Sequence, residues 1–187
     1  MEALLGIGSA FGLSTSAGLN AYIPMLMVSI LGRLGWLDLS EPFNIMESWW
    51  VITILSVLLV IEVFVDKIPA VDTVNDVVQT LVRPAAGALM FASQANIITD
   101  VNPLIAIVLG IMLAGGVHAT KATIRPLVTT ASVGTGNWVV SILEDVVAFF
   151  VSLMAILVPL FAVICMVVFF VLVFRTYRKR QNKVNFN

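Results

Sequence analysis

The sequence predicts an all-α membrane protein, and three features of the chain point to this fold class. Of the 187 residues, 60% are hydrophobic and 11% are charged, whereas soluble domains carry about 25% charged residues. The mean hydropathy is +1.06, and long apolar runs recur along the chain. A soluble core could not hide this much apolar surface. We therefore expect one transmembrane domain over residues 1–174, followed by a basic tail over residues 175–187.

The first three candidate helices each have a distinctive start. Residues 4–31 begin without the basic residues of a signal peptide, so we expect this segment to be retained. Residues 49–65 form the cleanest apolar run and begin with two tryptophans, which favour the headgroup layer. Residues 84–97 begin at a proline. Since crossing the hydrocarbon takes about 20 apolar residues, this third helix would have to start earlier.

The last three candidates are less regular. Residues 103–117 form a short apolar run, and residues 126–143 are weakly hydrophobic and rich in Thr, Ser and Gly. Residues 146–174 are long enough to tilt in the bilayer or to begin as an interfacial segment. We therefore expect a bundle of about six transmembrane helices, of which one or two are broken.

The basic residues predict the orientation of this bundle. Five of them crowd the tail, which by the positive-inside rule lies in the cytoplasm. With six spans the N-terminus is cytoplasmic too, and Arg33 alone falls outside. Glu144 and Asp145 are then expected as a solvated pair in an outer turn. The remaining basic residues fall on the cytoplasmic side, namely Lys67, Arg83, Lys121 and Arg125.

An Arg-Pro pair occurs twice in comparable places. Arg83-Pro84 opens the third segment and Arg125-Pro126 opens the fifth, each after a lysine at the end of the preceding segment. This pattern suggests an internal repeat of two hairpins. The alternative is chance, because a basic residue before proline is common at helix starts.

Small and polar residues are concentrated in the first and fifth segments. Asn20 and Asn137 fall near mid-depth, with Ser16 and Ser132 close to them in sequence. Membrane helices break only where the freed backbone faces protein or water, and broken helices often bind substrate in transporters. These four residues are therefore candidates for lining a pathway. Close helix packing, with the asparagines bonding across the interface, is an equal alternative.

A charge cluster follows the second segment. Glu62 is an acid well inside an apolar run, and Asp66 lies one helical turn later. A carboxyl group buried in lipid favours its neutral form and could carry a proton. The alternatives are an ion pair with Lys67 or Lys121, or a neutral carboxyl bonded to Asn or Ser. We favour ion or proton coupling, because charge inside a membrane is costly.

More ionisable residues follow on both predicted cytoplasmic loops. A salt-bridge network that clamps two hairpins together is expected from Asp72, Asp76, Arg83 and Arg125. His118, Lys121 and Lys67 are expected at the cytoplasmic mouth, where they could form a gate or an anion-binding vestibule.

Several function classes are disfavoured. The chain has no nucleophile-base pair, Gly-rich phosphate loop or metalloprotease motif, so we do not expect an enzyme. With one histidine and one cysteine, a zinc site is not expected, and no cofactor is indicated. A Glu/Asp/His site for another divalent cation is a weak alternative. The net charge of -1 gives no reason to expect a nucleic-acid partner.

Five stretches of the chain are distinctive, namely residues 16–24, 62–72, 83–88, 116–122 and 141–145, and the most specific part is Asp66-Lys67-Ile68-Pro69. In these stretches the chain resembles an uncharacterised family of small bacterial membrane proteins, the domain of unknown function number four-one-two-six. The resemblance implies a location in the bacterial cytoplasmic (inner) membrane and supplies no activity.

These observations lead to one principal hypothesis and two alternatives. We expect a transporter or channel for a small solute or ion, in contact with membrane lipids and assembled as a homo-oligomer such as a dimer. The first alternative is a protein that binds or translocates a lipid or polyprenyl phosphate through basic groups at the bilayer edge. The second alternative is an accessory membrane subunit without transport of its own.

Overall fold

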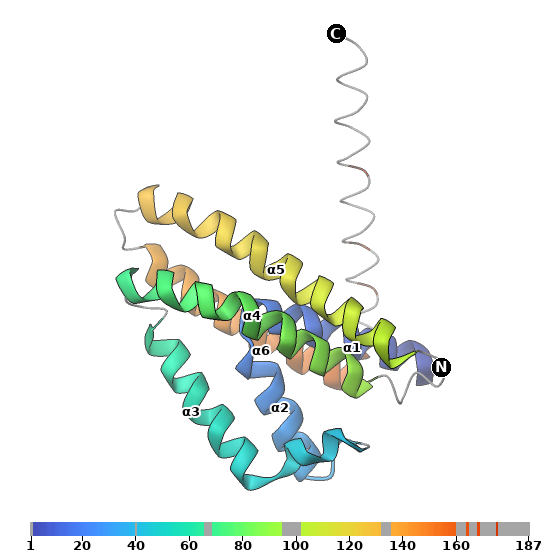
Figure 1. The fold of residues 1–187 in the computed structure, drawn as a ribbon. Coiled ribbons are helices and arrows are strands. Elements are labelled where there is room, and N and C mark those ends of the chain that lie inside the picture. Colours follow the sequence, from blue (N-terminus) through green and yellow to red (C-terminus); the bar gives the residue numbers. More distant parts are fainter. Residues whose placement is uncertain are drawn as a thin grey trace.

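The computed structural model describes residues 2–39, 41–65, 69–94, 102–131 and 136–159, together with the single residues 164, 168 and 175. The described residues form helices and contain no strand (Figure 1). The elements are α1 (Glu2–Leu19), α2 (Tyr22–Arg33), the short 3-10 helix η1 (Phe43–Glu47), α3 (Trp49–Val65), α4 (Pro69–Gln94), α5 (Pro103–Ala131) and α6 (Gly136–Leu157).

Two of these helices contain segments that are long and apolar enough to cross a membrane. They are Pro103–Arg125 in α5 and Trp138–Leu157 in α6. The shorter helices α2 and α3 are also apolar. The all-α class expected from composition is therefore confirmed.

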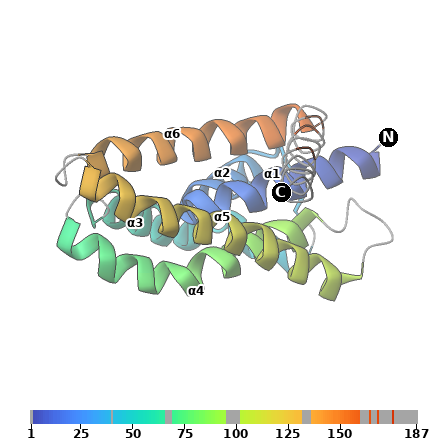
Figure 2. The same cartoon turned by 90° about the horizontal axis from the view of Figure 1, so that it is seen from above.

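Helix α1 forms the centre of the bundle. It lies among α2, α4, α5 and α6 (Figure 2) and contacts each of them. Its residues Ala10, Leu13 and Ala17 are fully buried. The small side chains of Ala10 and Ala17 let the neighbouring helices approach closely, which increases dispersion contacts along their length. The small residues of the first segment are thus used for packing.

Serine hydroxyls bond α1 to its neighbours. Ser9 Oγ donates to the Ala155 carbonyl of α6 at 2.7 Å, and Ser14 Oγ donates to the Gly87 carbonyl of α4 at 2.7 Å. A helical serine often bonds a carbonyl one turn back in its own helix. These two instead satisfy a hydroxyl across an interface, so they add directed interactions to apolar packing.

The chain turns at the end of α1. Helix α1 ends at Leu19, α2 begins at Tyr22, and α2 leaves the bundle at a steep angle (Figure 1). The broken helix that we expected within residues 4–31 is therefore observed. The single crossing expected over residues 4–31 stays a prediction, and the break offers a reversal of the chain as the alternative.

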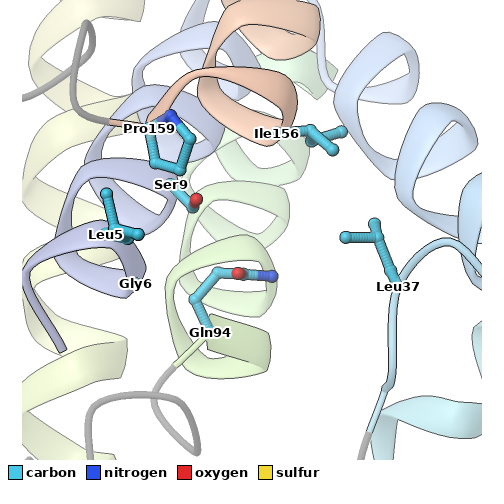
Figure 3. Close-up of a pocket in the computed structure, with 7 residues that line it drawn as sticks. All are labelled: Leu5, Gly6, Ser9, Leu37, Gln94, Ile156 and Pro159. Carbon is cyan, nitrogen blue, oxygen red and sulfur yellow. The ribbon is translucent and has the colours of Figure 1, made fainter. Parts of the chain in front are cut away.

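A pocket of about 220 Å³ is lined by residues of α1 and of the turn that follows α2. Leu5 of α1 and Leu37, which follows α2, line it with Gln94 of α4 and Pro159 after α6 (Figure 3). The start of α1 therefore lies at the same end of the bundle as the turn after α2. We call this end the N-terminal end, and we call the opposite end, where α1 gives way to α2, the Asn20 end.

Three predicted helix boundaries are wrong. Helix α5 continues through residues 118–125, which were expected to form a loop, and α6 continues through Glu144 and Asp145. Pro84 lies inside α4 and does not start a helix. The physical reason is that the charged residues at these positions find partners on other helices, so the chain does not need to leave the bundle. The predicted two-hairpin repeat requires each Arg-Pro pair to open a helix. Neither pair does so, because both lie inside helices.

The closest helix crossing lies between α4 and α5. A Cβ added at Gly110 would lie 2.7 Å from the Ala88 Cα, and one added at Gly87 would lie 2.6 Å from the Gly110 carbonyl oxygen. Both obstacles are backbone atoms, which cannot rotate away. These two glycines therefore set how closely α4 and α5 approach.

We predict that Gly110→Ala destabilises the fold by about 1–3 kcal/mol, because the added methyl group forces the backbones of α4 and α5 apart. The measurement is thermal unfolding in detergent. Gly116→Ala in the same helix is the matched control, since a Cβ there meets nothing within 4 Å. That variant should be neutral or slightly more stable. Equal unfolding temperatures for the two variants would show that the crossing is not tight.

A buried charged cluster at the break in α1

Buried polar and charged side chains gather at the Asn20 end of the bundle. They come from the break in α1 and from helices α3, α4, α5 and α6, which approach one another there. An ionised group in a low-dielectric interior is tolerated only with partners, so the contacts of each member define the site. The buried members are Asn20, Glu62, Gln79, Arg83, His118, Lys121 and Arg125.

Glu62 and Arg83 form the first half of the cluster. Glu62 lies in the last turn of α3, Arg83 lies within α4, and Arg83 NH2 is 3.0 Å from Glu62 Oε1. The side chains are 0% and 1% exposed for Arg83 and Glu62 respectively. Removal of either partner would leave a buried charge uncompensated, which costs about 3–5 kcal/mol. The sequence suggested Lys67 or Lys121 as partners of Glu62; the structure pairs Glu62 with Arg83 and Lys121 with Glu144, and Lys67 lies outside the described residues.

His118 connects Arg83 to α5. Its Nδ1 is 3.2 Å from Arg83 NH1, and its Nε2 is 3.1 Å from Thr80 Oγ1. A guanidinium group only donates hydrogen bonds, so Nδ1 must act as the acceptor. This assigns the neutral tautomer with its proton on Nε2, which donates to the Thr80 hydroxyl. A second proton on His118 would set two donors against each other at Arg83.

Lys121, Arg125 and Glu144 form the second half. Lys121 Nζ lies 2.8 Å and Arg125 NH2 lies 2.9 Å from the same oxygen, Glu144 Oε2. Lys121 Nζ also donates to the Leu19 carbonyl oxygen at 3.2 Å. That carbonyl is at the C-terminus of α1, where the helix dipole attracts positive charge. Lys121 therefore stabilises the C-terminus of α1 at the break.

Asn20 joins the break to α6. Its Oδ1 accepts hydrogen bonds from the backbone N–H groups of Tyr22 at 3.0 Å and Ile23 at 3.1 Å, which caps the start of α2. Its Nδ2 donates to Asp145 Oδ1 at 2.9 Å. One amide thus satisfies the backbone donors that the break exposes and a carboxylate on another helix.

The structure brings together part of the predicted pathway and network. Asn20, Glu62, Arg83, His118, Lys121 and Arg125 lie in one cluster, as described above. Ser16 is buried elsewhere, in the contact between α1 and α6, where it donates to the Ala148 carbonyl at 2.7 Å and accepts from Ser152 at 2.7 Å. Asp66, Lys67 and Ser132 lie outside the described residues. The side chains of Asp72, Asp76 and Asn137 are also outside the described part of the chain, although their backbones belong to α4 and α6.

Two acidic members of the site were missed by sequence reasoning. Glu144 and Asp145, which were expected in a solvated turn, lie inside α6 and are only partly exposed. The error also concerns sidedness, because Glu144 contacts Lys121 and Arg125, which were expected on the opposite side of the bilayer. A signal was present: Asp145 shares helical spacing with the small residues Ala148 and Ser152, which mark a packed face.

A groove opens beside the second half of the cluster. Its volume is about 380 Å³, and it is lined by apolar side chains from α1, α5 and α6 around three charged ones. Among the described residues, no group of His, Cys, Asp and Glu could hold a metal ion. The lining residues are Leu19, Val117, Thr120, Lys121, Ile124, Arg125, Val140 and Glu144.

Residues 7–179 match the family described as a domain of unknown function, DUF4126. The chain belongs to this family. The family resemblance inferred from the sequence is therefore confirmed, and the match includes every residue of the buried cluster. No curated protein and no solved structure matches the chain. The description of the family names no activity, so function has to be argued from the site.

We predict that exchanging the two groups of the Asn20–Asp145 pair separates their roles. Asn20→Asp keeps an acceptor for the α2 cap but sets two carboxylates against each other, so unfolding should occur at a clearly lower temperature. Adding Asp145→Asn restores an amide-carboxylate hydrogen bond in the reverse direction. The double variant should therefore recover much of the lost stability. Additive losses in the thermal unfolding of the single and double variants would show that the two residues do not interact.

Proposed function

We propose that this protein is a multi-pass protein of the bacterial cytoplasmic membrane that carries or conducts a small solute or ion. The apolar helices and the membership of a family inferred to be bacterial and membrane-bound support the location. The buried charged cluster at the break in α1 is the observation that carries the proposal of transport.

Burying these charged side chains costs free energy, and helix packing alone does not require them. This supports a role for the cluster in transport. Apolar side chains could join the same helices at lower cost, since buried ion pairs are often less stabilising than well-packed hydrophobic residues. Here His118, which hydrogen-bonds Arg83 of the Glu62–Arg83 pair, and Lys121, which pairs with Glu144, lie within one turn of α5. A transported ion or proton that enters the cluster would compete with these internal pairs and so change which helices they hold together.

The cluster also indicates an orientation. Arg83, Lys121 and Arg125 lie at the Asn20 end, whereas Arg33 lies at the far end of α2. We infer from this uneven distribution of basic residues that the Asn20 end faces the cytoplasm. Because α1 and α2 reverse direction at Asn20, the start of α1 then faces outward. This revises the cytoplasmic N-terminus that we expected from a single crossing over residues 4–31.

We predict that the N-terminus and Asp38 are labelled from the same, outer side of the membrane. The test uses a Cys165→Ser background with one cysteine either added ahead of Met1 or introduced as Asp38→Cys. Intact spheroplasts are treated with a membrane-impermeant maleimide, and the Cys165→Ser chain is the unlabelled control. Labelling of the two positions from opposite sides would restore a single crossing and would contradict the reversal at Asn20.

We predict that the purified protein confers flux on liposomes and that Glu62→Gln lowers it at least about tenfold. The Glu62→Gln change removes the negative charge that pairs with Arg83. We expect the loss of this ion pair to close or disorder the path through the cluster. The measurement uses dyes that report protons, monovalent cations and anions. Glu41→Gln makes the same chemical change at an exposed position and should leave flux unchanged.

Two results would contradict this proposal. Folded protein without flux for any of these ions would remove the ion-channel version and favour an accessory role. Undiminished flux in folded Glu62→Gln would mean that the pathway lies elsewhere. His118→Asn serves as a second variant if Glu62→Gln does not fold, because it alters the cluster without removing a charge from the Glu62–Arg83 pair.

A further inference from the structure

We propose that the groove between α5 and α6 binds the headgroup of an anionic phospholipid, with Lys121 and Arg125 as its phosphate ligands. In this assignment Glu144 is an internal carboxylate that occupies the phosphate position and is displaced on binding. The inference goes beyond transport, because it requires a binding site and no flux.

The two cations already hold an anionic oxygen. Lys121 Nζ and Arg125 NH2 lie 2.8 and 2.9 Å from one oxygen, Glu144 Oε2. A lysine and an arginine that converge on one oxygen are suited to bind phosphate or carboxylate, since charge-assisted bonds to such groups are short and strong. Both residues are about 95% buried, at 5% and 4% exposure. The site is therefore part of the interior of the fold.

The charge of the groove favours an anionic ligand over a cationic one. Its lining residues include two cations and one carboxylate. An arriving phosphate replaces the Glu144 carboxylate at Lys121 and Arg125 and retains both charge-assisted bonds. An arriving cation would have to displace Lys121 from Glu144 and from the Leu19 carbonyl while Arg125 stays beside it.

The apolar walls of the groove and its position at the end of the α5 span favour a lipid over a free anion. Leu19, Val117, Ile124 and Val140 give the groove apolar sides, which suit the first carbons of an acyl chain better than a hydrated ion. The apolar span of α5 runs from Pro103 to Arg125, so the two cations lie at its end. Basic groups at the edge of the hydrocarbon region are placed to hold lipid phosphate.

The test measures lipid binding to the full chain in phosphatidylcholine vesicles that contain dansyl-labelled phosphatidylglycerol. Energy transfer from the native tryptophans reports binding, and dansyl-labelled phosphatidylcholine gives the zwitterionic reference. We expect a preference for the anionic lipid of about tenfold. Lys121→Gln and Arg125→Gln should each remove most of this preference. Glu144→Gln should increase it severalfold, because the competing carboxylate is gone.

Two further variants keep the test decisive if the charge variants do not fold. Thr120→Phe fills the groove from an exposed position of α5 without changing charge, and it should weaken binding as the cation variants do. Arg33→Gln removes a positive charge from an exposed position at the opposite end of the bundle and should leave binding unchanged.

Four outcomes would overturn the assignment. They are no preference of the unaltered chain for the anionic lipid, a preference that survives Thr120→Phe, weaker binding in folded Glu144→Gln, and loss of the bound lipid on addition of millimolar inorganic phosphate. The last result would identify a site for a free anion. Because none of these measurements involves flux, failure here leaves the transport proposal to its own test.

Discussion

The cost of burying charge governs how this bundle is assembled. Glu62, Arg83, Lys121 and Arg125 are buried, and each is held by an oppositely charged group on a different helix. These contacts fix the position of α3 along α4 and of α5 along α6. Apolar surfaces alone would allow neighbouring helices to slide along one another, because one apolar contact can replace another at little cost. The ion pairs therefore specify the register of the helices more than their stability.

Close packing and the buried charges depend on each other. Gly87 and Gly110 bring the backbones of α4 and α5 together, and the same two helices carry Arg83 and His118 one to two turns further along. A wider separation would lengthen the Arg83–His118 hydrogen bond, which is already 3.2 Å. The small residues of α1 play the same part beside Leu19, since Gly18 faces the backbone of Ala114 on α5. Gly18 presents no side chain to α5, which lets the two helices approach and brings Lys121 to the end of α1.

The sequence predicted the helical class, the family and most members of the cluster, because these depend on composition and on the identity of costly residues. It predicted helix boundaries less well. Charged residues at 118–125 and at 144–145 look like loop residues when each segment is considered alone, since an isolated charge would leave the hydrocarbon. Only the packing of α5 against α6 shows that Glu144 neutralises Lys121 and Arg125. The turn of the chain at Asn20 was not predicted for a similar reason. In the sequence, an asparagine that caps a helix looks like one polar residue within an apolar run.

The Asn20 amide both caps α2 and bonds α6, so it couples the positions of these two helices. The oxygen of this side chain sets the direction of α2, and its nitrogen is fixed to Asp145 of α6. A small shift of α6 would therefore turn α2 about its first residue. Helix α2 has 12 residues and is about 18 Å long, so a rotation of about 10° would move its far end by about 3 Å. A sub-ångström change at the partly exposed Asp145 carboxylate would thus be amplified into a displacement of several ångströms at the far end of α2.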